Sequence, residues 1–169
     1  MKNHHLLFLG LSALLVASCS RPAPAPEATP DLYTQLTEES AYDSVFAAKL
    51  GSDDYGMKAY VMAFLKKGPN RDLDSLAAAE LQTAHLKNIF AMAASGKLAV
   101  AGPFMDDGDI RGIYIFNVPT VEEARALTAT DPAIQAGSLV MELHPWYGPA
   151  TLPLLAPLSK RVEKQSIVE

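Results

Sequence analysis

Residues Leu73–Ser95 read LDSLAAAELQTAHLKNIFAMAAS and give the clearest structural signal in this chain of 169 residues. The stretch is rich in Ala, Leu, Glu, Gln and Lys and contains neither Gly nor Pro, a composition that favours a long helix. Gly96 follows it and suits the left-handed position that ends a helix. Asp72 or Asp74 can cap its first turn. The segment is therefore predicted to be the principal helix of the domain.

One face of this predicted helix gathers apolar side chains at helical spacing. The members of this arc are Ala78, Leu81, Leu86, Ile89, Phe90, Met92 and Ala93. His85 lies inside the arc, with apolar residues four positions away on either side, so it is expected to face the sheet. A histidine placed in this way is either a core residue bonded to a backbone carbonyl or a group that can take and return a proton. The helical pattern alone leaves both interpretations open.

Apolar stretches on either side of this helix predict four strands. They are Lys58–Leu65, Leu98–Ala101, Ile110–Val118 and Ser138–His144, the last ended by Pro145–Pro149. The first and third carry apolar side chains on both faces, so both faces of the sheet should be covered. A second helix is predicted over Val121–Thr128, where Thr120 and Glu123 form a possible capping box. A further helical turn is predicted over Asp131–Ala136.

The predicted order is strand, helix, strand, strand, helix, strand. It favours an α+β, ferredoxin-like βαββαβ fold with an antiparallel sheet and both helices on one face. The other face then needs a cover, and a second copy of the chain provides one, giving a homodimer with the sheets face to face in a dimeric α+β barrel. The alternative covers are an N-terminal helix over residues 38–50 and the tail Thr151–Leu158.

Composition excludes several classes of function. Apolar residues make up 49% of the chain and the formal net charge is −5, which suits a globular domain and gives no electrostatic reason to bind nucleic acid. A single cysteine excludes an internal disulfide and a multi-cysteine zinc site. Asp106, Asp107 and Asp109 surround a glycine but lack the spacing of a calcium-binding EF-hand, so a solvated turn is expected.

The N-terminus is typical of a secreted lipoprotein. Leu6–Ala17 is an apolar run too short to span a bilayer but long enough for a signal peptide. Val16–Cys19 resembles the bacterial lipobox, which implies cleavage before Cys19, acylation of that cysteine with lipids such as palmitate, and a membrane anchor in the cell envelope. This would be the periplasmic side of the outer membrane in a Gram-negative host. The expected organisation is a signal peptide over 1–18, a lipidated tether and short helix over 19–57, a domain over 58–148 and a tail over 149–169.

Residues 58–148 resemble the YCII-related family, a branch of the dimeric α+β barrel superfamily. The resemblance depends on the order and spacing of short motifs: His85-Leu86, Gly102-Pro103, Asp131-Pro132, Gly137 and Pro145-Trp146. A dehydrochlorinase of chlorinated hydroxyquinols belongs to this family, and a His-Asp pair has been proposed as its members' active site. The resemblance therefore implies that His85 and Asp131 are the catalytic pair.

Other candidate residues carry weaker signals. Asp131 before Pro132 is also explained by helix capping alone. Glu142 and His144 are two residues apart on one strand face, which suggests either a polar edge pair or part of a substrate pocket. No nucleotide-binding or nucleophile-elbow motif occurs, and we expect no cofactor and no metal site. Two hypotheses remain: a cofactor-independent enzyme acting on a small molecule through His85 and Asp131, and a non-catalytic module that binds a ligand or an envelope partner.

Overall fold

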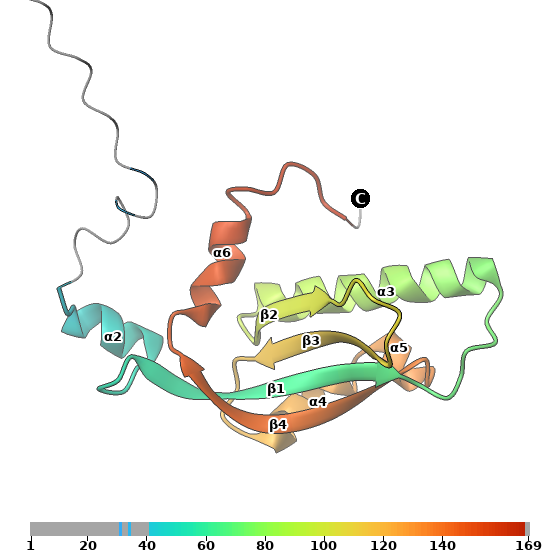
Figure 1. Cartoon of the computed structure of the whole chain (residues 1–169), viewed down its shortest axis with the longest axis horizontal. Helices are drawn as coiled ribbons and strands as arrows, with labels where there is room; N and C mark the ends of the chain where they lie inside the picture. Colours follow the sequence, from blue (N-terminus) through green and yellow to red (C-terminus); the bar gives the residue numbers. More distant parts are fainter. Residues whose placement is uncertain (1–30, 32–33, 35–40, 168–169) are drawn as a thin grey trace, which may run out of the picture. The chain divides into compact units, whose positions relative to one another are not determined.

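The computed structural model of the chain describes Asp31, Thr34 and residues 41–167 (Figure 1). The chain divides into two compact units, residues 1–41 and 42–169, and the second contains the sheet and its helices. The predicted signal peptide, Cys19 and the Pro/Ala tether lie outside the described residues. Within the described part, no helix has the length and apolar character needed to cross a membrane.

Four strands form one antiparallel sheet in the order β2-β3-β1-β4. The strands are β1 (Met57–Lys67), β2 (Leu98–Pro103), β3 (Ile110–Phe116) and β4 (Leu139–Pro149). The helices between them are α3 (Ser75–Ala94), α4 (Val121–Thr128) and the short α5 (Pro132–Gln135). α2 (Ser44–Leu50) precedes the sheet, while η1 (Leu152–Leu154) and α6 (Leu155–Ser159) follow it. The α+β, ferredoxin-like βαββαβ arrangement predicted from the sequence is confirmed.

The principal helix forms as predicted, with two refinements. Asp74, not Asp72, caps α3, because its carboxylate accepts a hydrogen bond of 2.9 Å from the backbone N–H of Ala77. Gly96 follows the helix with a φ of 72°, a conformation that other residues rarely adopt. Ala78, predicted to be part of the buried arc, is exposed. The first half of α3 thus leaves part of its apolar face uncovered.

The last strand extends beyond its predicted end. Pro145–Pro149 was expected to terminate it, but these residues continue the ladder with β1, in which Met57 pairs with Pro149. The expectation was wrong because β4 is an edge strand. A proline on an edge can leave its missing N–H on the side away from the neighbouring strand, so the ladder continues.

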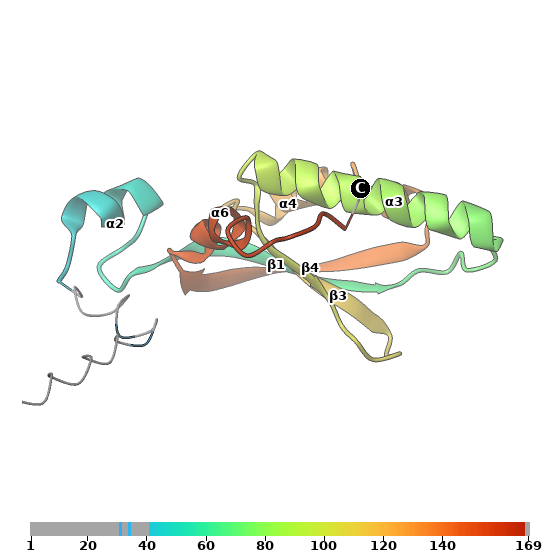
Figure 2. The same cartoon turned by 90° about the horizontal axis from the view of Figure 1, so that it is seen from above.

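α3 and α4 cover one face of the sheet (Figure 2). The centre of the core lies between this face and the two helices. Its buried members include Val61, Ala63, Tyr114 and Phe116 from the sheet, with Met92 from α3 and Ala124 from α4. Side chains at alternate positions of β1 and β3 point into this core, as the pleat of a strand requires.

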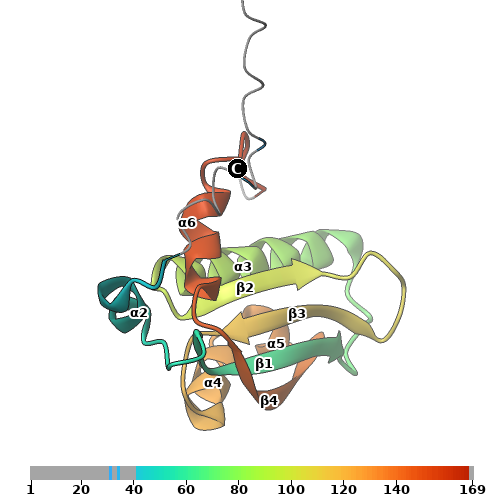
Figure 3. The ribbon, with the colours of Figure 1, turned by 60° about the vertical axis from the view of Figure 1, so that its left-hand side comes forward.

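The opposite face of the sheet is only partly covered. Tyr60, Ala99 and Ile115 are buried there beneath a group of half-buried side chains that includes Trp146 and Leu152. Leu152 belongs to η1, so the tail contributes to this cover, and Figure 3 shows that the segment after β4 runs on towards β2. α2 contains no buried residue. Met62, Phe64 and Ile113 remain half-exposed on this face.

Candidate active site

His85 and Asp131 meet inside the protein. The Nδ1 atom of His85 lies 2.8 Å from Oδ2 and 2.9 Å from Oδ1 of Asp131. Asp131 has no exposed surface and His85 is 6% exposed. The carboxylate accepts the hydrogen bond from the ring N–H, which fixes the orientation of the imidazole and leaves Nε2 as its other polar atom. Two residues from α3 and from the loop before α5 thus form one buried pair.

Asp131 caps a helix and contacts His85 with the same carboxylate. Its Oδ1 accepts a hydrogen bond of 2.9 Å from the backbone N–H of Ala133 and so caps α5, with Pro132 at the first helical position. The same carboxylate binds His85. Helix capping therefore holds the carboxylate in the place where it contacts the imidazole.

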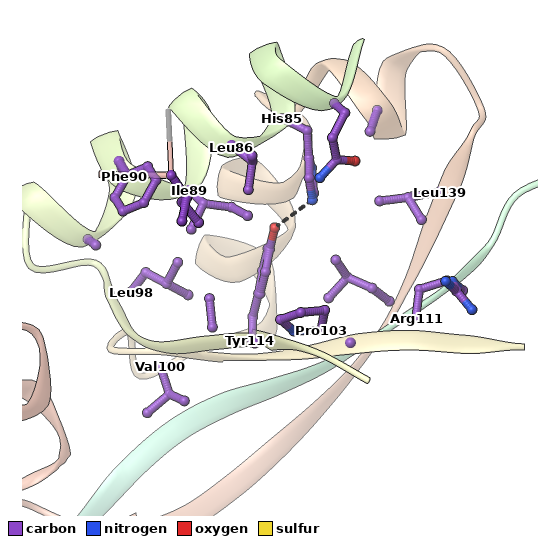
Figure 4. A pocket seen from close by; sticks show the side chains of 18 of the residues that line it. His85, Leu86, Ile89, Phe90, Leu98, Val100, Pro103, Arg111, Tyr114 and Leu139 are labelled. Atoms are coloured by element: carbon purple, nitrogen blue, oxygen red, sulfur yellow. Dashed lines mark hydrogen bonds between the residues drawn. The ribbon is translucent and has the colours of Figure 1, made fainter. Parts of the chain in front are cut away.

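Tyr114 is the third member of the site, and the sequence did not identify it. Its hydroxyl lies 3.5 Å from Nε2 of His85, and the two rings are stacked with centroids 6.5 Å apart (Figure 4). Burial, and after it the negative charge of Asp131, raise the pKa of Tyr114 above its ordinary value of 10.0. The phenol therefore keeps its proton near neutral pH. The alternation of side chains along β3 assigns Tyr114 to one face of the sheet. An aromatic residue at such a position is expected to pack in the core, so the pattern gives no sign of a functional role.

A cavity of about 960 Å³ opens beside His85. α3 forms one wall and β2 another, and Figure 4 shows His85 and Tyr114 pointing towards each other between them. Its apolar lining includes Leu81, Leu86, Ile89, Phe90, Leu98 and Leu139. α6 and the residues after it, up to Ile167, form the remaining wall. The volume and the apolar lining are those of a small-molecule pocket.

The structure does not bring Glu142 and His144 to this pair. Glu142 lies opposite Phe64 and His144 opposite Met62 in the ladder, which puts both on the sheet face away from the helices. Nε2 of His144 is 2.9 Å from Oε1 of Glu142, and Lys66 also forms an ion pair with this carboxylate. Hydrogen bonds from Lys66 and then His144 lower the pKa of Glu142. Neither residue lines the cavity beside His85.

The described residues contain no group of three or more His, Cys, Asp or Glu side chains that could hold a metal ion. In the turn between β2 and β3, Asp109 instead forms an ion pair of 3.7 Å with Lys67. Oδ1 of Asp106 accepts a hydrogen bond from the backbone of Gly108. The carboxylates of Asp106 and Asp109 therefore have partners in or beside this turn.

Replacement of Asp131 should destabilise the fold more than replacement of an ordinary capping residue. Asp131→Ala removes both a helix cap and the partner of a buried imidazole, and we expect a loss of about 3–5 kcal/mol in the free energy of unfolding. Asp74→Ala removes only an exposed cap and should cost about 1 kcal/mol. Urea denaturation of the two variants provides the measurement. Equal losses would mean that the His85–Asp131 contact contributes nothing to stability.

The sequence of this domain matches a known protein family. Residues 59–147 match the YCII-related domain. The 5-chloro-2-hydroxyhydroquinone dehydrochlorinase from Burkholderia phenoliruptrix AC1100, solved in complex with 2,5-dihydroxybenzoquinone, is similar at 21% sequence identity and a TM-score of 0.39, over 51% of this chain and 92% of that chain. A search of curated proteins found no match. Because the domain match spans more than half of the chain and includes His85 and Asp131, this protein belongs to the YCII-related domain family.

Proposed function

We propose that this protein is a cofactor-independent enzyme that uses His85 as a general acid and base on a small cyclic molecule. The observation that carries the proposal is the buried His85–Asp131 pair in the wall of a cavity of about 960 Å³. Membership of a family that includes a dehydrochlorinase gives it further support. Asp131 contacts His85 and has no exposed surface, so it is a positioning residue.

The geometry leaves one nitrogen of His85 available for chemistry. Nδ1 is occupied by both oxygens of Asp131. Among the described residues, the one polar partner of Nε2 is the Tyr114 hydroxyl at 3.5 Å, which lies beyond the usual range of a hydrogen bond. A substrate in the cavity can therefore replace this long contact at Nε2 with a shorter one of its own.

Proton abstraction followed by elimination suits these groups. Nε2 takes a proton from a saturated carbon next to a carbonyl group, such as that of the keto form of a phenol, the C–H electron pair forms a new C=C bond, and a leaving group departs with the electron pair of its own bond. The imidazolium, paired with Asp131, then returns the proton to the leaving group or to water. Return of the proton to a different carbon gives an isomerisation with the same apparatus.

Tyr114 supplies a hydrogen-bond donor for the same reaction. Its hydroxyl remains protonated because burial and the charge of Asp131 raise its pKa. A neutral phenol beside Nε2 can donate to the oxygen on which negative charge develops when the carbon loses its proton. Base and donor would then act on neighbouring atoms of one substrate.

Hydrogen exchange at carbon tests this function without a known product. The protein is incubated in D₂O with cyclic ketones, hydroxyquinols and chlorinated phenols, and proton NMR follows the loss of C–H signals. We expect exchange or elimination with at least one compound, and His85→Ala should lower the rate by about 10²–10⁴. Tyr114→Phe, which keeps the ring but loses the donor, should lower it by less.

Thr83→Ala is a matched control on the same helix, since the Thr83 hydroxyl bonds only to the carbonyl of Ala79. Its rate should equal that of the unmodified protein. A His85→Gln variant that retains full activity would overturn the assignment of His85 and favour a non-catalytic module that binds a ligand or an envelope partner.

We also propose that the enzyme is tethered to a bacterial cell envelope by lipid on Cys19. The support is the sequence alone: an apolar leader, small residues before the only cysteine, and a Pro/Ala tether after it. Cys19→Ala should abolish labelling by an alkyne analogue of palmitate and remove the protein from the membrane fraction. Ser20→Ala, one position away, should leave both unchanged. Labelled lipid on the Cys19→Ala protein would contradict the proposal.

A homodimer through the sheet face away from the helices completes the proposal. Met62, Phe64 and Ile113 are half-exposed on that face, and a standard interface would bury about 800 Å² of each copy. Light scattering on the chain from residue 31 onward should give twice the monomer mass. Ile113→Lys should yield monomers, while Leu76→Lys, at an exposed position of α3, should not. A monomer at tens of micromolar for the unmodified chain would refute the dimer.

A further inference from the structure

We propose that the cavity beside His85 selects an anionic ligand, an apolar ring that carries a carboxylate, sulfonate or phenolate group, and that Arg71 and Arg111 hold its charge. The inference rests on the proposed function, because it assumes that the substrate binds in this cavity. It adds the chemical class of the ligand that the cavity accepts. Both arginines line the cavity.

The charges in the cavity wall do not balance. Among the described residues that line it, Arg71, Arg111 and Lys160 are cationic and Glu163 alone carries a carboxylate. Glu163 forms an ion pair of 2.6 Å with Lys160. Within the described residues, neither arginine has a carboxylate within ion-pair distance. The cavity is therefore locally cationic in a chain whose net charge is −5, and a concave site of one sign concentrates ligands of the opposite sign.

A β-bulge brings Arg111 into this wall. Leu65 pairs with Gly112, but the next residue of β1, Lys66, pairs with Ile110, so Arg111 is an extra residue without a partner in β1. A bulge breaks the alternation of side chains between the two faces of a sheet. In a regular strand, Arg111 would lie on the opposite face of the sheet from its neighbour Gly112, and the bulge removes this constraint. Its Nη1 donates to the carbonyls of Asp106 and Gly108, and these contacts use neutral acceptors.

Arg71 is anchored at the same end of the sheet. Its Nη1 donates to the carbonyl of Ser138, immediately before β4, over 3.2 Å. In the ladder, Lys67 pairs with Leu139 and Lys66 with Ile110, so the starts of β4 and β3 lie on either side of the end of β1. Both guanidinium groups therefore belong to one end of the cavity.

The remaining lining is apolar, so the ligand must combine charge with an apolar body. Figure 4 shows Arg111 and Leu139 on one side of His85 and Phe90 with Leu98 on the other. A guanidinium binds a carboxylate or sulfonate through paired, charge-assisted hydrogen bonds. A ligand with its anionic group at the arginines would extend its ring along the apolar wall past Nε2 of His85.

Two fluorescent probes of one shape test the inference on the full-length protein: anilinonaphthalene sulfonate, an anion, and N-phenylnaphthylamine, its uncharged counterpart. We expect the anion to bind at least about tenfold more tightly. Arg71→Gln combined with Arg111→Gln should weaken anion binding by about 10- to 100-fold and change binding of the neutral probe by less than about twofold. Arg125→Gln, an equal charge change at an exposed position of α4, should alter neither.

Ala78→Trp locates the probe, because this exposed residue of α3 lines the cavity and a tryptophan there would fill it. We expect both probes to bind less tightly to this variant. Equal affinity for the two probes, or anion binding that survives both the double-arginine variant and Ala78→Trp, would overturn the inference. The proposed enzymatic function is tested separately from this inference. His85→Gln should retain the preference for the anionic probe. A protein that shows this preference but no catalytic activity would contradict the proposed enzymatic function and leave the inference about the ligand intact.

Discussion

The buried carboxylate of Asp131 is the constraint on which the site depends. A charged group without exposed surface must be paired, and within the described chain the carboxylate of Asp131 has only His85 and the N–H of Ala133 as hydrogen-bond partners. The pair joins the middle of α3 to the loop before α5. Met92 anchors the end of the same helix in the core, while Ala78 and the residues around it border open space. The cavity runs along both halves of this helix, because Ala78 and Leu81 line it before His85, and Ile89 and Phe90 line it after His85.

Local signals predicted most of the fold. The cap at Thr120 and the apolar pattern after it gave α4 with its observed bounds, and the absence of Gly and Pro between Leu73 and Ser95 gave α3 to within two residues. Such features depend on neighbours in sequence. The end of β4 was not predicted correctly because a proline ends a strand only where the ladder requires a backbone N–H at that position. This requirement is absent on the outer side of an edge strand, and the arrangement of the whole sheet decides which strand lies at the edge.

The candidate site was predicted only in part, and the prediction came from the family resemblance and not from local sequence signals. Spacing alone could not pair His85 with Asp131, which are 46 residues apart, and the family resemblance supplied the pair. Tyr114 was not predicted because alternation along β3 assigns a residue to a face and not to a neighbour, so a tyrosine beside a buried imidazole has the same pattern as one in the core. Helical periodicity has the same limit, since an apolar arc lining a cavity cannot be distinguished from one packed against a sheet.

The tail gives this member of the family a cavity wall outside the matched domain. Residues 155–167 line the cavity beyond the match at 59–147, and Lys160 lies 5.8 Å from the ring of Phe90. The two charged tail residues in the described lining of the cavity, Lys160 and Glu163, form an ion pair, so their charges cancel there. The unbalanced positive charge therefore stays at the arginines, at the far end from Phe90. If the proposed ligand binds here, this asymmetry would give it one favoured orientation, with its ring beside Nε2 of His85 and the Tyr114 hydroxyl.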